Sequence, residues 1–285
     1  MTIPYKEGTR VVIMAPIRSM ATVCRQCRPA LWLLVILLVC VIRPAFAQPA
    51  APFLTGEKLT FDIRWLRIPA GTAVLEVLPT AKRDGRDSFH FRLTVRTNAF
   101  LDTIYPVRDR VDSWTDPAMT RTLHYRKQQH EGSTHRNVKV TFDWKARTAQ
   151  YATAGENHPP IDIPPGTFDP FSVLYFARSQ IQTRPERIER PVTDGKKLVM
   201  GRGAIVRREK LRLRSGEIYD TYLLEPEIEH VGGVFKKSPG AKLKIWITAD
   251  DQCLPVKVQS KVVVGNFTAE LIAVEGNVAA FPANE

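Results

Sequence analysis

The chain has 285 residues, of which 44% are hydrophobic, and its 41 Lys and Arg outnumber its 29 Asp and Glu, for a formal net charge of +12. This hydrophobic content is typical of a globular protein and excludes an intrinsically disordered chain. The excess of positive charge favours an anionic partner, whose kind depends on where the chain works.

Residues 1–47 have the order of a secretory signal peptide. A basic stretch with Arg18, Arg25 and Arg28 precedes an apolar run of 12 residues, 31–42, and in residues 45–47, Ala-Phe-Ala, the first and third offer small side chains to a signal peptidase. We therefore expect cleavage before Gln48. The run is shorter than the ~20 residues that a membrane-spanning helix needs, so we expect no transmembrane span in the mature chain. A retained amino-terminal anchor is the alternative.

Export would determine which cysteines remain in the mature chain and which partners it meets. Cys24, Cys27 and Cys40 lie in the segment to be removed, so only Cys253 remains and stability must come from a hydrophobic core. The removed segment contains six Lys or Arg and one Glu, five of the net charges, which leaves +7 on the mature chain. Because an exported chain does not meet nucleic acid, its anionic partners would be lipid, lipopolysaccharide or polysaccharide. Solvated charge that maintains solubility is the alternative.

Strands with alternating hydrophobic and polar residues are predicted in much of residues 56–285. We expect these residues to form a single β-barrel-like domain that follows a Pro/Ala-rich tether, residues 48–55. In several segments hydrophobic residues alternate with polar ones, as in a strand with one buried face. These segments are Leu59 to Trp65, Phe89 to Val95, Val138 to Trp144 and Leu243 to Ile247. In the last of them Trp246 is the exception and would point outward. Amphipathic strands favour an antiparallel sheet and argue against a doubly wound α/β fold.

Turn signals separate about ten to twelve expected strands. They contain glycine and lie at residues 84–85, 131–133, 194–195, 215–216 and 232–233. A sheet of this length should curl, because full or partial closure removes its exposed edges. We therefore predict a mainly β fold, in which a curled antiparallel sheet forms a closed or incomplete barrel with one or two short helices packed on it.

Two helices are predicted. Asp169 and Pro170 supply an N-cap and a proline at the first helical position, and the spacing that follows predicts a helix near 169–181. This helix would pack across a mouth or open face of the sheet. A shorter helix is expected at Ala99–Ile104. Residues 153–168 are predicted to be a long loop, and Gln182–Pro191 a polar connector.

Several short motifs follow one another along the mature chain in a characteristic order. They are Gly56–Asp62 with Ala70–Ala73, Ile104–Arg110 with Asp112–Trp114, Phe168–Ser172 with Tyr175 and Arg178, and Leu243–Thr248 with Asp250, Asp251 and Leu254–Val256. In order and spacing they resemble the exported bacterial proteins of the domain of unknown function 3108 (DUF3108) family. The resemblance implies a periplasmic or otherwise exported β-rich domain with no established activity. By analogy of fold, it also implies an incomplete, helix-covered barrel like those of lipoprotein carriers.

The densest group of polar residues lies between Tyr105 and Trp114. On a strand, Arg108, Arg110, Asp112 and Trp114 would share one face, and we name these four the Arg/Trp cluster. Two guanidinium groups beside an aromatic ring could hold a carboxylate or phosphate and support an apolar or sugar ring. The alternative, which we favour, is that the arginines pair with Asp112 and neighbouring carboxylates at the barrel rim.

The predicted helix adds Tyr175 and Arg178, which are three residues apart and so share a face. They could close a cavity over a ligand. We favour the simpler role of docking the helix on the sheet, with the arginine head in water. A basic stripe on residues 207–214 suits either an anionic membrane surface or an edge strand, and we favour the edge strand.

We find no catalytic or metal-binding motif in the sequence. His124, His130 and His135 lack the spacing of a compact zinc site, and we see no nucleophile elbow or prominent carboxylate pair. We therefore expect no metal, no cofactor and no catalytic residue.

The function expected from these features is a non-catalytic periplasmic binding or carrier protein. It would hold an amphiphilic or anionic envelope component, a lipid or a glycan, in the sheet interior, with the Arg/Trp cluster at the head group. One alternative is an envelope assembly or scaffold protein that binds a partner protein through a sheet edge or the face of Trp246. A cell-wall hydrolase is the less favoured alternative.

Overall fold

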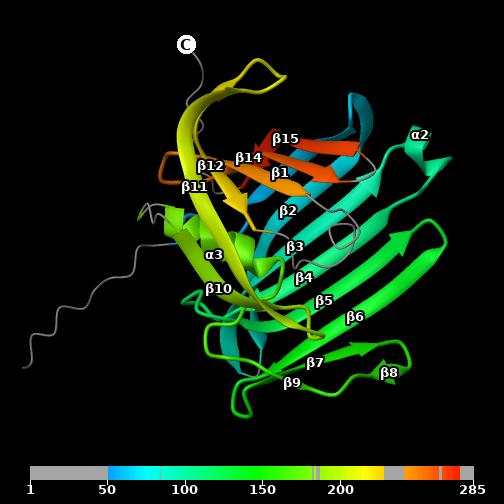
Figure 1. Ribbon diagram of the computed structural model, residues 1–285, viewed down its shortest axis with the longest axis vertical. Coiled ribbons are helices and arrows are strands. Elements are labelled where there is room, and N and C mark those ends of the chain that lie inside the picture. Colours follow the sequence, from blue (N-terminus) through cyan, green and yellow to red (C-terminus); the bar gives the residue numbers. More distant parts are fainter. Residues whose placement is uncertain are drawn as a thin grey trace, which may run out of the picture. The chain divides into compact units, whose positions relative to one another are not determined.

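Strands make up most of the computed structural model, which describes residues 51–83, 85–181, 183, 187–227, 241–262 and 265–276 (Figure 1). These residues fall in one compact unit, Pro49–Glu285. The predicted signal peptide lies outside the described residues, as do residues 48–50 of the tether, Asp84 and the turn predicted at 232–233.

Fifteen strands and two helices occupy the described residues. The helices are α2 (Ala99–Asp102) and α3 (Ser172–Ile181). The strands are β1 (Lys58–Trp65), β2 (Ile68–Arg83), β3 (Arg86–Thr97), β4 (Arg108–Thr115), β5 (Thr122–Glu131), β6 (Thr134–Asp143), β7 (Thr148–Thr153), β8 (Glu156–Asn157), β9 (Ile161–Asp162), β10 (Arg187–Thr193), β11 (Leu198–Arg212), β12 (Ile218–Pro226), β13 (Lys242–Thr248), β14 (Pro255–Val262) and β15 (Gly265–Glu275).

All the described strands belong to one antiparallel sheet. Neighbours follow the order β10-β11-β12-β13-β14-β15-β1-β2-β3-β4-β5-β6-β7-β8, and β9 pairs with β7. Among the described residues no ladder connects β10 with β7, β8 or β9, so the sheet curls without closing. The prediction of a mainly β fold with a curled antiparallel sheet and short helices is confirmed, and of its two forms the structure has the incomplete barrel.

The two ends of the sheet still meet through a loop and a turn. The N–H of Phe168 donates to the carbonyl oxygen of Pro191, and the N–H of Thr193 donates to that of Phe168, both at 2.9 Å, which ties the segment before α3 to the edge strand β10. In the β10–β11 turn, the ammonium group of Lys196 lies 4.1 Å from the centre of the Tyr151 ring on β7. These contacts bridge the open seam without a continuous ladder.

The sheet has more strands than the expected ten to twelve. The short strands β8 and β9 lie in the predicted loop at 153–168, and β10 begins inside the predicted connector at 182–191. Pro191 cannot donate to a ladder, but β10 is an edge strand, where proline is tolerated. Its proline and its charges therefore give this strand the composition of a connector.

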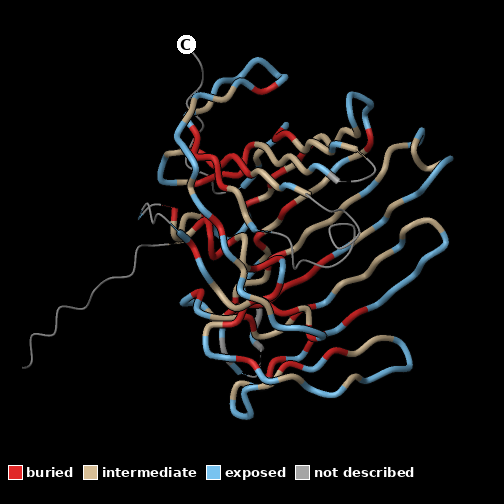
Figure 2. Tube along the Cα trace, viewed as in Figure 1, coloured by how far each residue is buried: buried red, intermediate tan, exposed pale blue. Residues whose placement is uncertain are grey.

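The two faces of β4 meet different surroundings. Val111 belongs to the hydrophobic core, and the hydroxyl of Ser113 donates to Asp169 just before α3, so these residues face the interior. Because side chains alternate along a strand, Asp112 and Trp114 face the opposite side. Figure 2 shows buried residues concentrated around α3 and the strands beside it, whereas the far end of β5 is mostly intermediate and the adjoining start of β6 is exposed.

Trp246 lies in one cross-strand row with Lys257 and Asp62, on the face opposite Ile245 and Ile247 as predicted, but this face is covered there and Trp246 is buried. The residue is 6% exposed, and its indole N–H donates to Glu209 of β11 at 2.8 Å. The end of the β11–β12 hairpin lies over this side of the sheet, because Arg214 reaches Asp62 of β1 at 3.3 Å. The alternation along β13 cannot reveal a covering layer that comes from distant strands.

The beginning of α3 is fixed by hydrogen bonds to Asp169. One carboxylate oxygen accepts the N–H groups of Phe171 and Ser172, at 2.8 and 3.0 Å, as an N-cap does. The other accepts the hydroxyl groups of Ser113 and Thr122, at 2.5 and 2.8 Å. Both predicted helices are confirmed, with α3 three residues shorter at its start and α2 two residues shorter at its end.

Candidate ligand-binding cavity

A cavity of about 710 Å³ lies between α3 and strands β10 to β14. Its volume falls in the range of small-molecule binding sites, about 300–1,000 Å³. Most of the residues that line it are apolar: Pro170, Phe171, Val173, Leu174 and Ala177 around α3, and Ile188, Val192, Val199, Met200, Leu224, Pro226, Leu243, Ile245 and Val258 on the strands. The cavity can therefore take an apolar group out of water.

The two sides of α3 are filled to different degrees. Towards the sheet, the Tyr175 ring stacks on Phe91 with 3.8 Å between ring centres and meets Phe53 edge-on at 5.2 Å. Towards the cavity lie Phe171, just before the helix, and Val173, Leu174 and Ala177 of the helix. Figure 1 shows α3 between the β10–β11 arm and strands β3 and β4. The helix thus packs closely on one side and leaves space on the other.

Arg178 belongs to the closely packed side, and the prediction that its head lies in water is wrong. Its guanidinium group donates to both carboxylate oxygens of Glu57, at 2.7 and 3.0 Å, and to the carbonyl oxygens of Gln252 and Cys253. Burial alone would lower the pKa of Arg178, but the Glu57 carboxylate outweighs it and raises that pKa. Glu57 lies 121 residues away in sequence, so no local pattern marks it as the partner.

Two glycines of β11 let side chains of the neighbouring strands pack against its backbone in the opposite wall. Gly201 pairs with Arg190 in the β10–β11 ladder and lines the cavity, as does Gly203. A Cβ on Gly201 would lie 2.8 Å from Cγ2 of Val192, and one on Gly203 would lie 3.2 Å from Cδ1 of Leu224. A side chain at either position would therefore require Val192 or Leu224 to move.

The two arginines that line the cavity have different partners. Arg202 pairs with Glu189 at 3.3 Å and with Glu227 at 3.7 Å. Arg190 donates to the carbonyl oxygen of Glu189 at 2.8 Å, and its guanidinium lies 4.2 Å from the centre of the Phe176 ring. Within the described residues no ion pair joins Arg190 to a carboxylate, and its partial burial lowers its pKa.

The Arg/Trp cluster is assembled around the buried carboxylate of Asp112. This group makes hydrogen bonds with Nε2 of His90, Nε of Arg92 and Nε of Arg110, at 2.8, 2.8 and 2.7 Å. Burial alone would raise the pKa of Asp112, but these bonds outweigh it and hold that pKa well below its ordinary range. Trp114 stacks on His90, with 4.3 Å between ring centres. Arg110 is thus engaged by a carboxylate of the protein itself.

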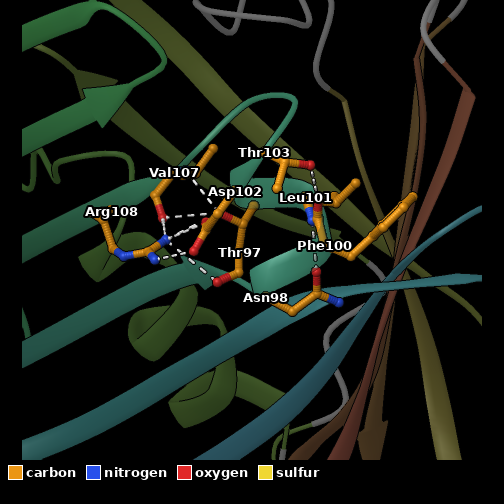
Figure 3. A network of polar contacts seen from close by, with 8 residues as sticks. All are labelled: Thr97, Asn98, Phe100, Leu101, Asp102, Thr103, Val107 and Arg108. Atoms are coloured by element: carbon orange, nitrogen blue, oxygen red, sulfur yellow. Dashed lines mark hydrogen bonds and ion pairs between the residues drawn. The ribbon is translucent and has the colours of Figure 1, made fainter.

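Arg108 belongs to a separate network beside α2 (Figure 3). Its two terminal nitrogens donate to the two carboxylate oxygens of Asp102 at 2.9 and 2.5 Å, and one of them also donates to the hydroxyl of Thr97 at 3.1 Å. The Asn98 side chain caps α2 by accepting the N–H of Leu101 at 2.9 Å. This network closes a turn at the end of β3 and leaves Arg108 paired within the protein.

The seven predicted site residues therefore do not form one site. The Arg/Trp cluster faces away from the interior, Tyr105 is half-exposed beside Gly132, and Tyr175 and Arg178 dock α3 on the sheet. None of the seven is among the described residues that line the cavity. The cavity residues were missed because β10 has the composition of a connector. The alternation of Ile188, Arg190 and Val192 is the signal that could have found them.

The histidines lie apart from the cavity. The rings of His130 and His135 are 4.7 Å apart in the β5–β6 hairpin, and His124 lies beside Trp114. Among the residues that the structure describes, no three His, Cys, Asp or Glu side chains are grouped as they would be around a metal ion. In the same residues, no helix has both the length and the apolar character needed to cross a membrane.

These observations define the class of protein: an incomplete antiparallel barrel with a mostly apolar cavity along its helix. A family model described as protein of unknown function (DUF3108) matches residues 60–272, and the chain belongs to this family, as its motifs suggested. A solved structure, the beta-barrel-like protein of domain of unknown function DUF1849 from Brucella abortus, is similar with a TM-score of 0.51. The two are 8% identical over 78% of this chain and 98% of that one, which shows a likeness of fold alone. No curated protein matches the chain.

Proposed function

We propose that this chain is a non-catalytic binding or carrier protein of the bacterial envelope. It works in the periplasm or outside the cell after removal of residues 1–47, and it holds an amphiphilic lipid or glycan whose apolar part enters the cavity. The supporting observation is the cavity itself, with its volume of about 710 Å³ and its mostly apolar lining. Protein interiors are normally packed with few voids larger than a water molecule, so an open space of this size beside a well-packed helix suits an occupant.

The polar part of the ligand meets other residues than those of the Arg/Trp cluster. That cluster lies on the opposite face of β4 from the interior, and its central carboxylate already engages Arg92 and Arg110. Charged residues also line the cavity itself, among them Arg190, Arg202 and Lys242. The head group therefore lies among these side chains, with the apolar part between α3 and β11.

The scaffold alternative receives less support from the described surface. Of the two surfaces expected to bind a partner protein, a sheet edge and the face of Trp246, the second is covered, because Trp246 is buried with its N–H bound to Glu209. The hydrolase alternative needs convergent buried carboxylates. Asp112, Asp169 and Glu57 are buried, but each is engaged in hydrogen bonds within the fold.

Native mass spectrometry tests the proposal directly. The full chain, expressed in a bacterial host and purified without detergent after the host has processed it, should carry a non-covalent lipid or glycolipid. Organic extraction should remove this extra mass and leave the protein folded. Bare protein in repeated gentle preparations would contradict the proposal.

A variant with a filled cavity provides the control. Leu174→Trp replaces an aliphatic side chain with a larger indole ring where α3 faces the open space. The purified variant should therefore be folded and should carry no ligand. A matched tryptophan on the exposed side of the β5–β6 hairpin, Arg136→Trp, should retain the same extra mass as the original chain. Equal retention by both variants would mean that the ligand lies elsewhere.

A further inference from the structure

Arg190 occupies a position that alternation assigns to the interior. Ile188 and Val192, two residues to either side on β10, are buried and line the cavity, and Arg190 lines it with them. Arg187 and Glu189 occupy the exposed face of the same strand. A cation between two interior positions is costly unless a partner offsets its lost hydration.

The protein supplies Arg190 with only part of what a guanidinium group can bind. One terminal nitrogen donates to the carbonyl oxygen of Glu189, and the flat face of the group lies over the Phe176 ring. An arginine has five N–H donors, so an edge with two parallel donors remains for an anion. Across the ladder stands Gly201, which has no side chain to pair with Arg190.

The carboxylates that line the cavity are engaged by other groups. Glu227 pairs with Arg187 at 3.0 Å and Glu225 with Lys244 at 3.4 Å. The Asp194 carboxylate accepts main-chain N–H groups within the β10–β11 turn. Among the described residues none of these three makes a bond to Arg190, so its positive charge is left for a ligand.

We infer that Arg190 is the anion-binding residue of this cavity, and that the ligand is a single-chain amphiphile with one negative charge on its head group, of the kind a fatty acid carboxylate provides. This inference rests on the proposed function and names its ligand class. One guanidinium edge binds one planar carboxylate through two parallel hydrogen bonds. The adjoining apolar wall of Ile188, Val192 and Leu174 then takes the chain, within a volume suited to one small ligand.

Calorimetric titration with two matched probes tests the inference. The purified full chain, processed by its host and freed of lipid, is titrated at pH 8 with decanoate and with 1-decanol, which differ in the head group alone. Decanoate should bind more tightly than decanol. Arg190→Gln should weaken decanoate binding by about tenfold or more and change decanol binding by less than about twofold. Arg190→Lys, which retains the charge without the flat donor edge, should give an intermediate loss.

Arg136→Gln is the matched control, because Arg136 lies on the exposed side of the β5–β6 hairpin and does not line the cavity. Its affinity for both probes should equal that of the original chain. Unchanged decanoate binding by folded Arg190→Gln, with decanol still bound, would overturn the role of Arg190 and leave the proposed function intact. Failure of the original chain to bind decanol would instead contradict the proposed function. If Arg190→Gln does not fold, the decanoate affinity of Arg190→Lys decides, and an unchanged value overturns the inference.

Discussion

The two sides of α3 contrast a filled interior with an open one. On the side of β1 and β3, Phe53, Phe91 and Tyr175 are in ring contact, and Arg178 is paired with Glu57. On the side of β10 to β12, a cavity of about 710 Å³ lies between the helix and the strands. The difference shows how one helix can be both a fixed part of the core and one wall of a cavity.

The same contrast holds for two arginines of the interior. Arg178 is fully buried and has a carboxylate partner, Glu57, with two direct hydrogen bonds. Arg190 is half-buried and has a carbonyl oxygen and an aromatic face instead. The first is needed for the fold, whereas the second has donors to spare. Substitution of each should therefore affect a different property.

The largest expected effect is that of breaking the filled side. Arg178→Met should lower the free energy of unfolding by about 3–5 kcal/mol, because it leaves the Glu57 carboxylate buried without its cation. Urea unfolding followed by circular dichroism measures this loss. Arg187→Met, at an exposed ion pair, should cost less than about 1 kcal/mol. Similar losses in the two variants would mean that the buried pair does not hold α3.

Cys253 provides a second measure of the same side. Its carbonyl oxygen accepts a hydrogen bond from Arg178, its side chain is buried, and burial raises the pKa of its thiol to about 11. A thiol reagent at pH 8 should therefore label the native chain slowly. Arg178→Met should speed up the labelling, whereas Arg190→Gln should leave the rate unchanged.

The next effect concerns the Asp112 carboxylate on the opposite face of the sheet. Asp112→Asn should cost about 2 kcal/mol at pH 7, because the charge-assisted bonds to Arg92 and Arg110 are lost. The pKa of Asp112 is lower in the folded chain than its ordinary value near 3.9, so the carboxylate stabilises the fold above about pH 4 and loses this effect as the pH falls further. The difference between the two chains in urea unfolding should shrink from pH 7 to pH 3. A constant difference would contradict this account.

The smallest effect on stability is expected from filling the open side. Leu174→Trp should change the free energy of unfolding by less than about 1 kcal/mol, because the indole ring enters existing space. Phe91→Trp, the matched change on the filled side, should cost about 1–3 kcal/mol through overpacking. An equal cost at both positions would show that the two sides of α3 are equally full.

The fold was largely predictable from the sequence, because its main signals are local. Alternation in segments such as Leu59 to Trp65 indicates strands with one buried face, and Asp169 with Pro170 marks the start of α3. The candidate site was less predictable, since it depends on which distant elements meet. Nothing near Arg178 in sequence points to Glu57, and nothing near Trp246 points to β11. Arg190 follows the alternation of side chains along a strand. Its strand contains a proline and several charges, however, and was therefore predicted to be a connector.

The account rests on the claim that the open side of α3 takes an apolar chain, and the heat capacity change of 1-decanol binding tests this most directly. Calorimetric titration at several temperatures should show one molecule bound per chain with a negative heat capacity change, the mark of apolar surface leaving water. Leu174→Trp should abolish this binding. A folded original chain that binds no decanol, or a filled variant that binds it equally well, would contradict the account.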